Sequence, residues 1–251
     1  HGTAVKAYRE TGLTAEIGVV LNMQMAYPYN PEDTGDIEAA GRFHQQANNL
    51  FADPILKGCY PQEFFDYLQK QGVVLPAILP GDMELTSQPI DFLGLNTYFA
   101  SYVRADKTQW PLHGSLCETG RPKTDANWEI CPDAMYDLLC WIDKTYDRPK
   151  IIITENGTCM NDIINAEGKV EDYRRVDYIK RYLMNVKKAM DEGVNVAGYY
   201  VWSFTDNFEW AWGLSRRFGI VYVDYATQQR IPKQSALWFA DVIKNNGFEV
   251  S

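Results

Sequence analysis

The sequence has no apolar run that approaches the roughly 20 residues that a helix needs to span a bilayer, so we expect no contact with a membrane. It has five cysteines, an odd number, which are widely spaced and include no C-x-x-C pair. This pattern predicts neither a disulfide framework nor a zinc site, and it favours a reducing, cytoplasmic location. We expect no metal ion and no other cofactor.

Basic residues are also scarce. Lys and Arg number 24 against 33 Asp and Glu in the 251 residues, which gives a net charge of −9. Because nucleic-acid binding depends on a basic face that contacts phosphates, we expect no nucleic-acid partner, and neutral or cationic ligands fit better. Aromatic residues make up 14% of the chain, with 16 Tyr and 7 Trp, which suits a site that stacks against flat apolar faces.

Short apolar runs that end in polar residues alternate with segments of helical periodicity. The predicted strands are residues 17–22, 92–98, 151–154 and 194–204. The predicted helices are residues 1–11, 37–50, 62–71, 132–142, 178–190 and 232–246. Alternation of this kind predicts a parallel sheet with helices outside it.

Four finer features are expected. Asp53-Pro54 is predicted to end the helix that begins at Ile37. Residues 105–130 have no periodicity and are predicted to form a long irregular loop, whereas residues 218–224 are predicted to form one arm of a hairpin. The last helix is expected to bury its apolar side chains, which are Ala236, Leu237, Phe239, Ala240 and Ile243.

The length allows a complete (β/α)₈ barrel, since about 250 residues is typical of that fold, but only the four strong strands listed above are present. We therefore predict an α/β fold in which residues 1–251 form a single domain, half of a (β/α)₈ TIM barrel. Polar residues gather after the carboxyl ends of the strands, where such barrels place their active sites. A doubly wound domain is the alternative, although no G-x-G-x-x-G sequence follows any of the strands.

Glu155 ends the apolar strand at 151–154 and is followed by the turn dipeptide Asn156-Gly157. Carboxylates are rarely fully buried, so one at the mouth of an apolar strand indicates a partnered, functional group. The alternative is a strand that ends at the surface, with Glu155 solvated. The strand alone favours neither interpretation.

Three ordered motifs decide between them. They are Ile-Thr-Glu-Asn-Gly at 153–157, Trp-Ser-x-x-Asp-Asn-Phe-Glu-Trp at 202–210 and Arg-Phe-Gly-Ile-x-Tyr-Val-Asp at 217–224. Together they resemble the signatures of the family 1 glycoside hydrolases, the retaining β-glucosidases and their relatives. Supporting matches extend from His-Gly-x-Ala-Val at the start to Lys-x-Ser-Ala-x-Trp at 233–238. The resemblance implies the C-terminal half of the barrel, strands five to eight with their helices.

The resemblance also implies a role for each matching residue. Glu155 matches the nucleophile that attacks the anomeric carbon and forms a glycosyl-enzyme intermediate. Tyr98 matches the tyrosine that hydrogen-bonds this carboxylate, although this chain has Asn-Thr-Tyr where the family has Asn-Tyr-Tyr. The other implied substrate-binding residues are Asn96, Trp128 on the leaving-group side, Trp202 beneath the sugar ring, Glu209 and Trp210 at its hydroxyls, and Phe218 in the same pocket.

One essential part of the family's site is missing from this sequence. A retaining glycosidase needs a second carboxyl group about 5 to 5.5 Å from the nucleophile to protonate the leaving oxygen. In the family this acid/base glutamate lies in an Asn-Glu-Pro motif, which does not occur here. Asn30-Pro31-Glu32 has the same residues in another order and is not expected to replace it.

Two functions remain open from the sequence. The first is hydrolysis of terminal non-reducing β-D-glucosyl or related β-glycosyl residues by a retaining double displacement, in which this chain supplies the nucleophile. The second is a catalytically inactive half barrel that serves as a sugar-binding or self-associating scaffold. Because a half barrel has two exposed edge strands, the expected partner is a complementary N-terminal half-barrel chain or a second copy. The expected substrate is a neutral β-glycoside, since residues 205–213 carry only acidic charges.

Overall fold

A computed structural model describes residues 1–249 of the chain. Its central sheet has four parallel strands in the order β1-β3-β6-β7. The strands are β1 (Gly18–Asn22), β3 (Phe92–Asn96), β6 (Ile151–Asn156) and β7 (Val196–Val201). This order follows the chain without the reversal that defines a doubly wound sheet, so the half-barrel prediction is confirmed and the alternative is wrong. The edge strands are β1 and β7.

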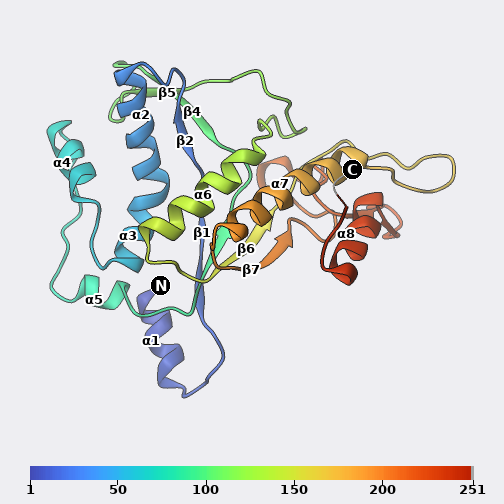
Figure 1. Cartoon of the computed structure of the whole chain (residues 1–251), viewed down its shortest axis with the longest axis horizontal. Helices are drawn as coiled ribbons and strands as arrows, with labels where there is room; N and C mark the ends of the chain where they lie inside the picture. Colours follow the sequence, from blue (N-terminus) through green and yellow to red (C-terminus); the bar gives the residue numbers. More distant parts are fainter. Residues whose placement is uncertain (250–251) are drawn as a thin grey trace.

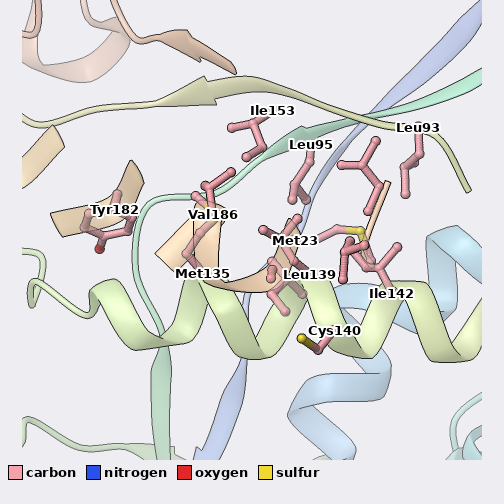
Figure 2. Close-up of a cluster of buried hydrophobic side chains, with 14 of the residues drawn as sticks. Met23, Leu93, Leu95, Met135, Leu139, Cys140, Ile142, Ile153, Tyr182 and Val186 are labelled. Carbon is pink, nitrogen blue, oxygen red and sulfur yellow. The ribbon is translucent and has the colours of Figure 1, made fainter. Parts of the chain in front are cut away.

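Two long helices cover one face of this sheet. Figure 1 shows α6 (Pro132–Thr145) and α7 (Tyr173–Asp191) lying side by side across the strands. Alternate strand residues point at these helices because strand side chains alternate between the two faces. Figure 2 shows part of the resulting core, which includes Leu93, Leu95, Ile153, Met135, Leu139, Ile142 and Val186.

The opposite face of the sheet exposes apolar side chains. Val20 of β1 is 50% exposed and Tyr200 of β7 is 61% exposed, whereas their neighbours Val19 and Tyr199 pack against the core. Within residues 1–249 this face is therefore much less covered than the one beneath α6 and α7.

The remaining elements surround the sheet. Ahead of β6 and α7 these are α1 (Gly2–Glu10), β2 (Ala26–Pro28), α2 (Thr34–His44), a π-helical turn (Gln45–Asn49), α3 (Leu50–Leu56), α4 (Gln62–Lys70), α5 (Asp82–Thr86), β4 (Ser101–Ala105) and β5 (Gly114–Leu116). After β7 follow a 3₁₀ turn (Trp210–Trp212), β8 (Val221–Val223), β9 (Arg230–Pro232) and α8 (Gln234–Asn245). The pairing of β8 with β9 confirms the predicted hairpin arm.

Pro54 does not end its helix, so that prediction is wrong. It lies inside α3, which continues to Leu56. The π-helical turn at Gln45–Asn49 stands just before α3 and already departs from the regular α-helical hydrogen-bond pattern. The missing N–H of the proline falls near the end of α3, only two residues before its last residue.

Two other expectations need correction. Residues 105–130 are not wholly irregular, because β5 pairs antiparallel with β4 and Lys123 bridges Glu129. The prediction that α8 buries its whole apolar set is also wrong, since Leu237 is 55% exposed and Ile243 is 67% exposed. Among the described residues α8 contacts α7, and Ala236 and Phe239 are among the side chains of α8 that pack against the core.

Every helix within residues 1–249 is too short or too polar to cross a lipid bilayer. The five cysteines are all free thiols, two of them at or near the surface, Cys59 and Cys117. No group of three or more His, Cys, Asp or Glu side chains in the described range is placed to hold a metal ion. The cytoplasmic location stays a prediction.

His44, the last residue of α2, is held neutral by its surroundings. Its ring packs edge-on against Trp141, with ring centroids 4.4 Å apart. Asn48 Nδ2 lies 3.1 Å from His44 Nδ1, and because an amide nitrogen only donates, this contact favours an unprotonated ring nitrogen. Burial lowers the pKa of His44 from 6.5 to about 4.

We expect this half-buried histidine to make stability depend on pH. Between pH 6.5 and pH 4 the unfolded chain binds a proton that the folded chain does not, so the free energy of unfolding falls as the pH falls through this window. The loss between pH 7 and pH 4.5 is about 2 to 3 kcal/mol. Urea unfolding at both pH values measures it. H44Q should lose less stability than the wild type over this interval. Equal losses in the two proteins would contradict the assignment.

Candidate active site

Glu155 is the second-last residue of β6 and is half-buried, so it is not a solvated turn residue. The hydroxyl of Tyr98, which follows β3, donates a hydrogen bond to Glu155 Oε2. Burial raises the pKa of Tyr98 far above its usual value, and the hydrogen bond to the negative Glu155 raises it further. Tyr98 therefore keeps its proton and stays a donor to the carboxylate.

Backbone contacts hold the ends of β3 and β6 together at this point. Asn96 is paired with Glu155 in the sheet register, and the N–H of Thr97 donates to the carbonyl oxygen of Glu155 at 3.0 Å. Asn96 Oδ1 accepts a hydrogen bond of 2.7 Å from Thr154 Oγ1. Asn96, Tyr98 and Glu155 thus lie together at the carboxyl end of the sheet.

Gly157 lets the backbone at Trp202 approach the end of β6 closely. A Cβ atom at this position would lie 1.8 Å from the carbonyl oxygen of Trp202, so no other residue fits without moving the backbone. The N–H of Trp202 donates to the carbonyl oxygen of Asn156 at 2.9 Å. The segment after β7, which begins with Trp202, is therefore fixed directly against the end of β6.

Aromatic rings form one wall beside Tyr98. The ring centroid of Trp128 lies 5.4 Å from that of Tyr98 and 5.7 Å from that of Phe218. Phe218 is 1% exposed and packs with both Trp128 and Trp202. Trp212 joins the same cluster, 5.9 Å from Trp128, although the sequence motifs did not single it out.

Glu209 carries the second carboxylate of the cluster. Its Oε2 is buried and accepts no hydrogen bond from the described residues. Burial raises the pKa of Glu209, Trp202 acts in the opposite direction, and the negative charge of Glu155 raises it further. A buried acceptor without a donor is unfavourable, so this oxygen is suited to receive a hydroxyl group from a ligand.

Trp210 stands apart from this group. It lies in the 3₁₀ turn and is 82% exposed, so its indole does not join the cluster around Trp128. Its role, like those of the other site residues, stays a prediction.

Comparison with known proteins fits this geometry. The family model described as glycosyl hydrolase family 1 matches residues 1–248. The chain belongs to glycosyl hydrolase family 1. It is 42% identical to beta-glucosidase A of Acetivibrio thermocellus and 43% identical to beta-glucosidase A of Thermotoga maritima, covering 99% of this chain and 55% of each relative. The solved family 1 β-glucosidase of Thermotoga maritima superposes with a TM-score of 0.93 at 42% identity, over 100% of this chain and 55% of that one.

The chain therefore spans about half the length of the relatives it matches. It corresponds to their C-terminal half, as the motifs implied, and its sheet is the matching half of a (β/α)₈ barrel. Other solved structures of the Thermotoga maritima enzyme are complexes with noeuromycin and with glucoimidazole, and they superpose with TM-scores of 0.90 and 0.92.

Several of the family motif residues are structural rather than exposed to the site. Asp206 accepts hydrogen bonds from Arg217 at 2.5 Å and from Lys233 at 2.9 Å. Lys233 also pairs with Asp162 at 2.5 Å, and Asp162 pairs with Arg175 at 2.7 Å. Arg175 in turn pairs with Asp172, which completes a set of three acids and three bases.

This ion network joins the loop after β6 to the segment after β7. Burial lowers the pKa of Lys233 and the charge of Arg175 lowers it further, while Asp162 and Asp206 oppose the change. Asp206 also accepts the backbone N–H of Gly219 at 3.1 Å, next to Phe218. The network therefore places Phe218 and the start of the Glu209 segment relative to Glu155.

Sequence reasoning missed this network. One feature of the sequence could have indicated the network. Arg175 lies three residues before Tyr178, so the charged side chain falls on the apolar, buried face of α7. A cation in that position is rarely buried unless it is paired, and here it is 0% exposed.

Proposed function

We propose that this chain supplies the nucleophile and most of the sugar-binding residues for hydrolysis of terminal non-reducing β-D-glucosyl, or closely related β-glycosyl, residues with retention of configuration. One observation carries the proposal: a carboxylate held by a protonated tyrosine interacts electrostatically with a second carboxylate, which has a buried, unused oxygen. The relatives that are 42% and 43% identical are named β-glucosidases, which supports it.

Glu155 would act as the nucleophile. Its oxygen forms a bond to the anomeric carbon while the bond to the leaving oxygen breaks, which gives a glycosyl ester. Tyr98 donates to the carboxylate and so fixes its direction. In the second step a water molecule attacks the same carbon, the ester bond breaks and Glu155 is released as a carboxylate.

Proton transfer needs a second carboxyl group. The leaving oxygen must gain a proton in the first step, and the attacking water must lose one in the second. Because the sequence has no Asn-Glu-Pro motif, we assign this acid/base group to a complementary half barrel.

Glu209 and the aromatic wall would hold the sugar. The unused Glu209 Oε2 accepts a hydrogen bond from a sugar hydroxyl, and only an ionised carboxylate accepts with both oxygens. Trp202 and Trp128 offer faces to the apolar side of the ring.

The uncovered surfaces support a complementary half as the partner. The open face of the sheet exposes Val20 and Tyr200, and the outer flank of α8 exposes Leu237 and Ile243. The relatives have nearly as much chain again, because this chain covers only 55% of them. We propose that the partner half completes the barrel through β1, β7 and α8.

We expect full activity only when both halves are present. The chain would be mixed with the N-terminal half of the Thermotoga maritima relative, and glucose release from cellobiose would be followed. A positioned general acid contributes roughly 10² to 10⁴-fold, so the mixture should exceed the chain alone by at least roughly 100-fold. With 2,4-dinitrophenyl β-D-glucoside, whose leaving group needs no proton, the difference should shrink.

The matched control uses the same N-terminal half with its Asn-Glu-Pro glutamate changed to Ala. This control should associate equally well but hydrolyse cellobiose poorly. Equal cellobiose hydrolysis by the chain with and without its partner would contradict the proposal.

The exposed edges of β1 and β7 favour one alternative, an inactive self-associating scaffold. Light scattering, together with measurements of glucose binding and activity, separates the two functions. A homodimer that binds glucose, has no activity and does not exchange for the N-terminal half would support the scaffold, whereas a heterodimer with activity supports the hydrolase.

A further inference from the structure

Two tyrosines of α7 reach the back of the active site. Tyr178 and Tyr182 are 1% and 2% exposed, and their rings stack with centroids 4.3 Å apart. Figure 2 shows Tyr182 at one end of the core, beside Val186 and below the sheet. Both hydroxyl groups donate to one acceptor, the carbonyl oxygen of Tyr98, at 3.1 Å from Tyr178 and 2.8 Å from Tyr182.

The other contacts of these hydroxyls fix their direction. The N–H of Cys131, at the start of α6, donates to the Tyr182 hydroxyl at 3.2 Å. Asn156 Nδ2 lies 3.4 Å from the Tyr178 hydroxyl and donates to it. Because each hydroxyl oxygen accepts from an N–H, its own proton is directed at Tyr98.

The same cluster also holds the residue after Glu155. Asn156 Nδ2 donates to the carbonyl oxygen of Thr97 at 2.8 Å, and Asn156 Oδ1 accepts from the Tyr199 hydroxyl at 2.7 Å. The backbone of Tyr98 and the backbone next to Glu155 are therefore linked through one set of buried hydrogen bonds.

We propose that Tyr178 and Tyr182 are positioning residues for the nucleophile. They fix the carbonyl group of Tyr98, and through it the side chain whose hydroxyl donates to Glu155. This inference rests on the proposed function, in which Glu155 attacks the sugar. Phenylalanine would fill the same core volume without placing hydroxyl groups in an apolar cluster, so the hydroxyls serve the contact with Tyr98 rather than packing.

The first test uses the chain itself and needs no activity. Tyrosine labelled with ¹³C at Cζ reports on each phenol, and the Tyr98 signal is assigned by its loss in Y98F. The E155Q variant should move this signal, because the acceptor of its hydrogen bond loses its charge. Y182F and Y178F should each shift or broaden it, since the Tyr98 backbone is less constrained.

Y146F is the matched control. Tyr146 is also buried, and its hydroxyl also donates a hydrogen bond, of 2.7 Å to Asp53, but it stands at the end of α6 opposite Cys131. This variant should lose stability and leave the Tyr98 signal unchanged. A Tyr98 signal that is identical in wild type, Y178F and Y182F would overturn the inference.

The second test uses the two-half assembly. Y182F should lower kcat about 3- to 10-fold with little change in KM, because one hydrogen bond is lost behind the nucleophile rather than at the sugar. Y146F should keep the wild-type kcat and KM, and equal kcat values for Y182F and Y146F would refute the positioning role.

The two proposals fail in different ways. Absence of any Glu155-dependent turnover in the wild-type assembly would end the proposed function, while the Tyr98 signal would still decide whether the tyrosine pair positions Tyr98.

Discussion

The E155Q variant is expected to lose essentially all hydrolysis in the two-half assembly, by at least roughly 10⁴-fold in kcat. Glutamine keeps the shape of the side chain and an oxygen that can accept from the Tyr98 hydroxyl. It removes the negative charge of the carboxylate that we propose as the nucleophile. Initial rates with 2,4-dinitrophenyl β-D-glucoside measure the loss without the influence of the acid step.

A covalent label gives the same answer independently of turnover. A 2-deoxy-2-fluoro β-glucoside with a dinitrophenyl leaving group should attach one sugar to Glu155 and none to E155Q, as read by peptide mass analysis. The control is E167Q, an exposed residue in the loop that follows β6, which should keep the wild-type rate and label. Undiminished turnover in E155Q would remove Glu155 from the mechanism.

Among the variants proposed above and below, D206N is expected to lower the free energy of unfolding the most. Asp206 is fully buried and pairs with both Lys233 and Arg217. When Asp206 is replaced by asparagine, Arg217 loses its ion pair with residue 206, and Lys233 keeps only its ion pair with Asp162. Removing one partner from a buried ion pair costs about 3 to 5 kcal/mol, since the remaining charge stays desolvated. Urea unfolding at pH 7 measures the change.

An exposed ion pair provides the matched control for this change. Asp191 pairs with Lys187 on α7, where the side chains are 62% and 69% exposed. D191N should cost less than about 1 kcal/mol, because water already screens that pair. Similar losses in D206N and D191N would show that the buried network contributes little.

Loss of the network should also disturb the site. Asp206 accepts the N–H of Gly219, whose neighbour Phe218 packs on Trp128 and Trp202. We therefore expect the D206N assembly to bind sugar more weakly even at temperatures where it remains folded, because the aromatic wall is less well fixed.

The sequence by itself determined the parallel half barrel and the position of Glu155. Continuous apolar runs such as Ile151-Ile152-Ile153 are typical of strands in parallel sheets, so their alternation with amphipathic helices predicts the topology. The ordered motifs then identified the family and, with it, the residues that gather at the carboxyl ends of the strands. These features are local in the chain, and local patterns encode them.

Only the tertiary structure decided what each of these side chains contacts. Tyr98 and Glu155 are 57 residues apart, and Tyr98 and Tyr182 are 84 apart, so no local period links them. The same holds for the network around Asp206 and for Trp212 in the aromatic wall. Periodicity predicted a helix over residues 178–190 that contains Tyr182, whereas Arg175 lay outside the predicted range. A buried hydroxyl or guanidinium is stable only with a partner, and packing alone supplies that partner.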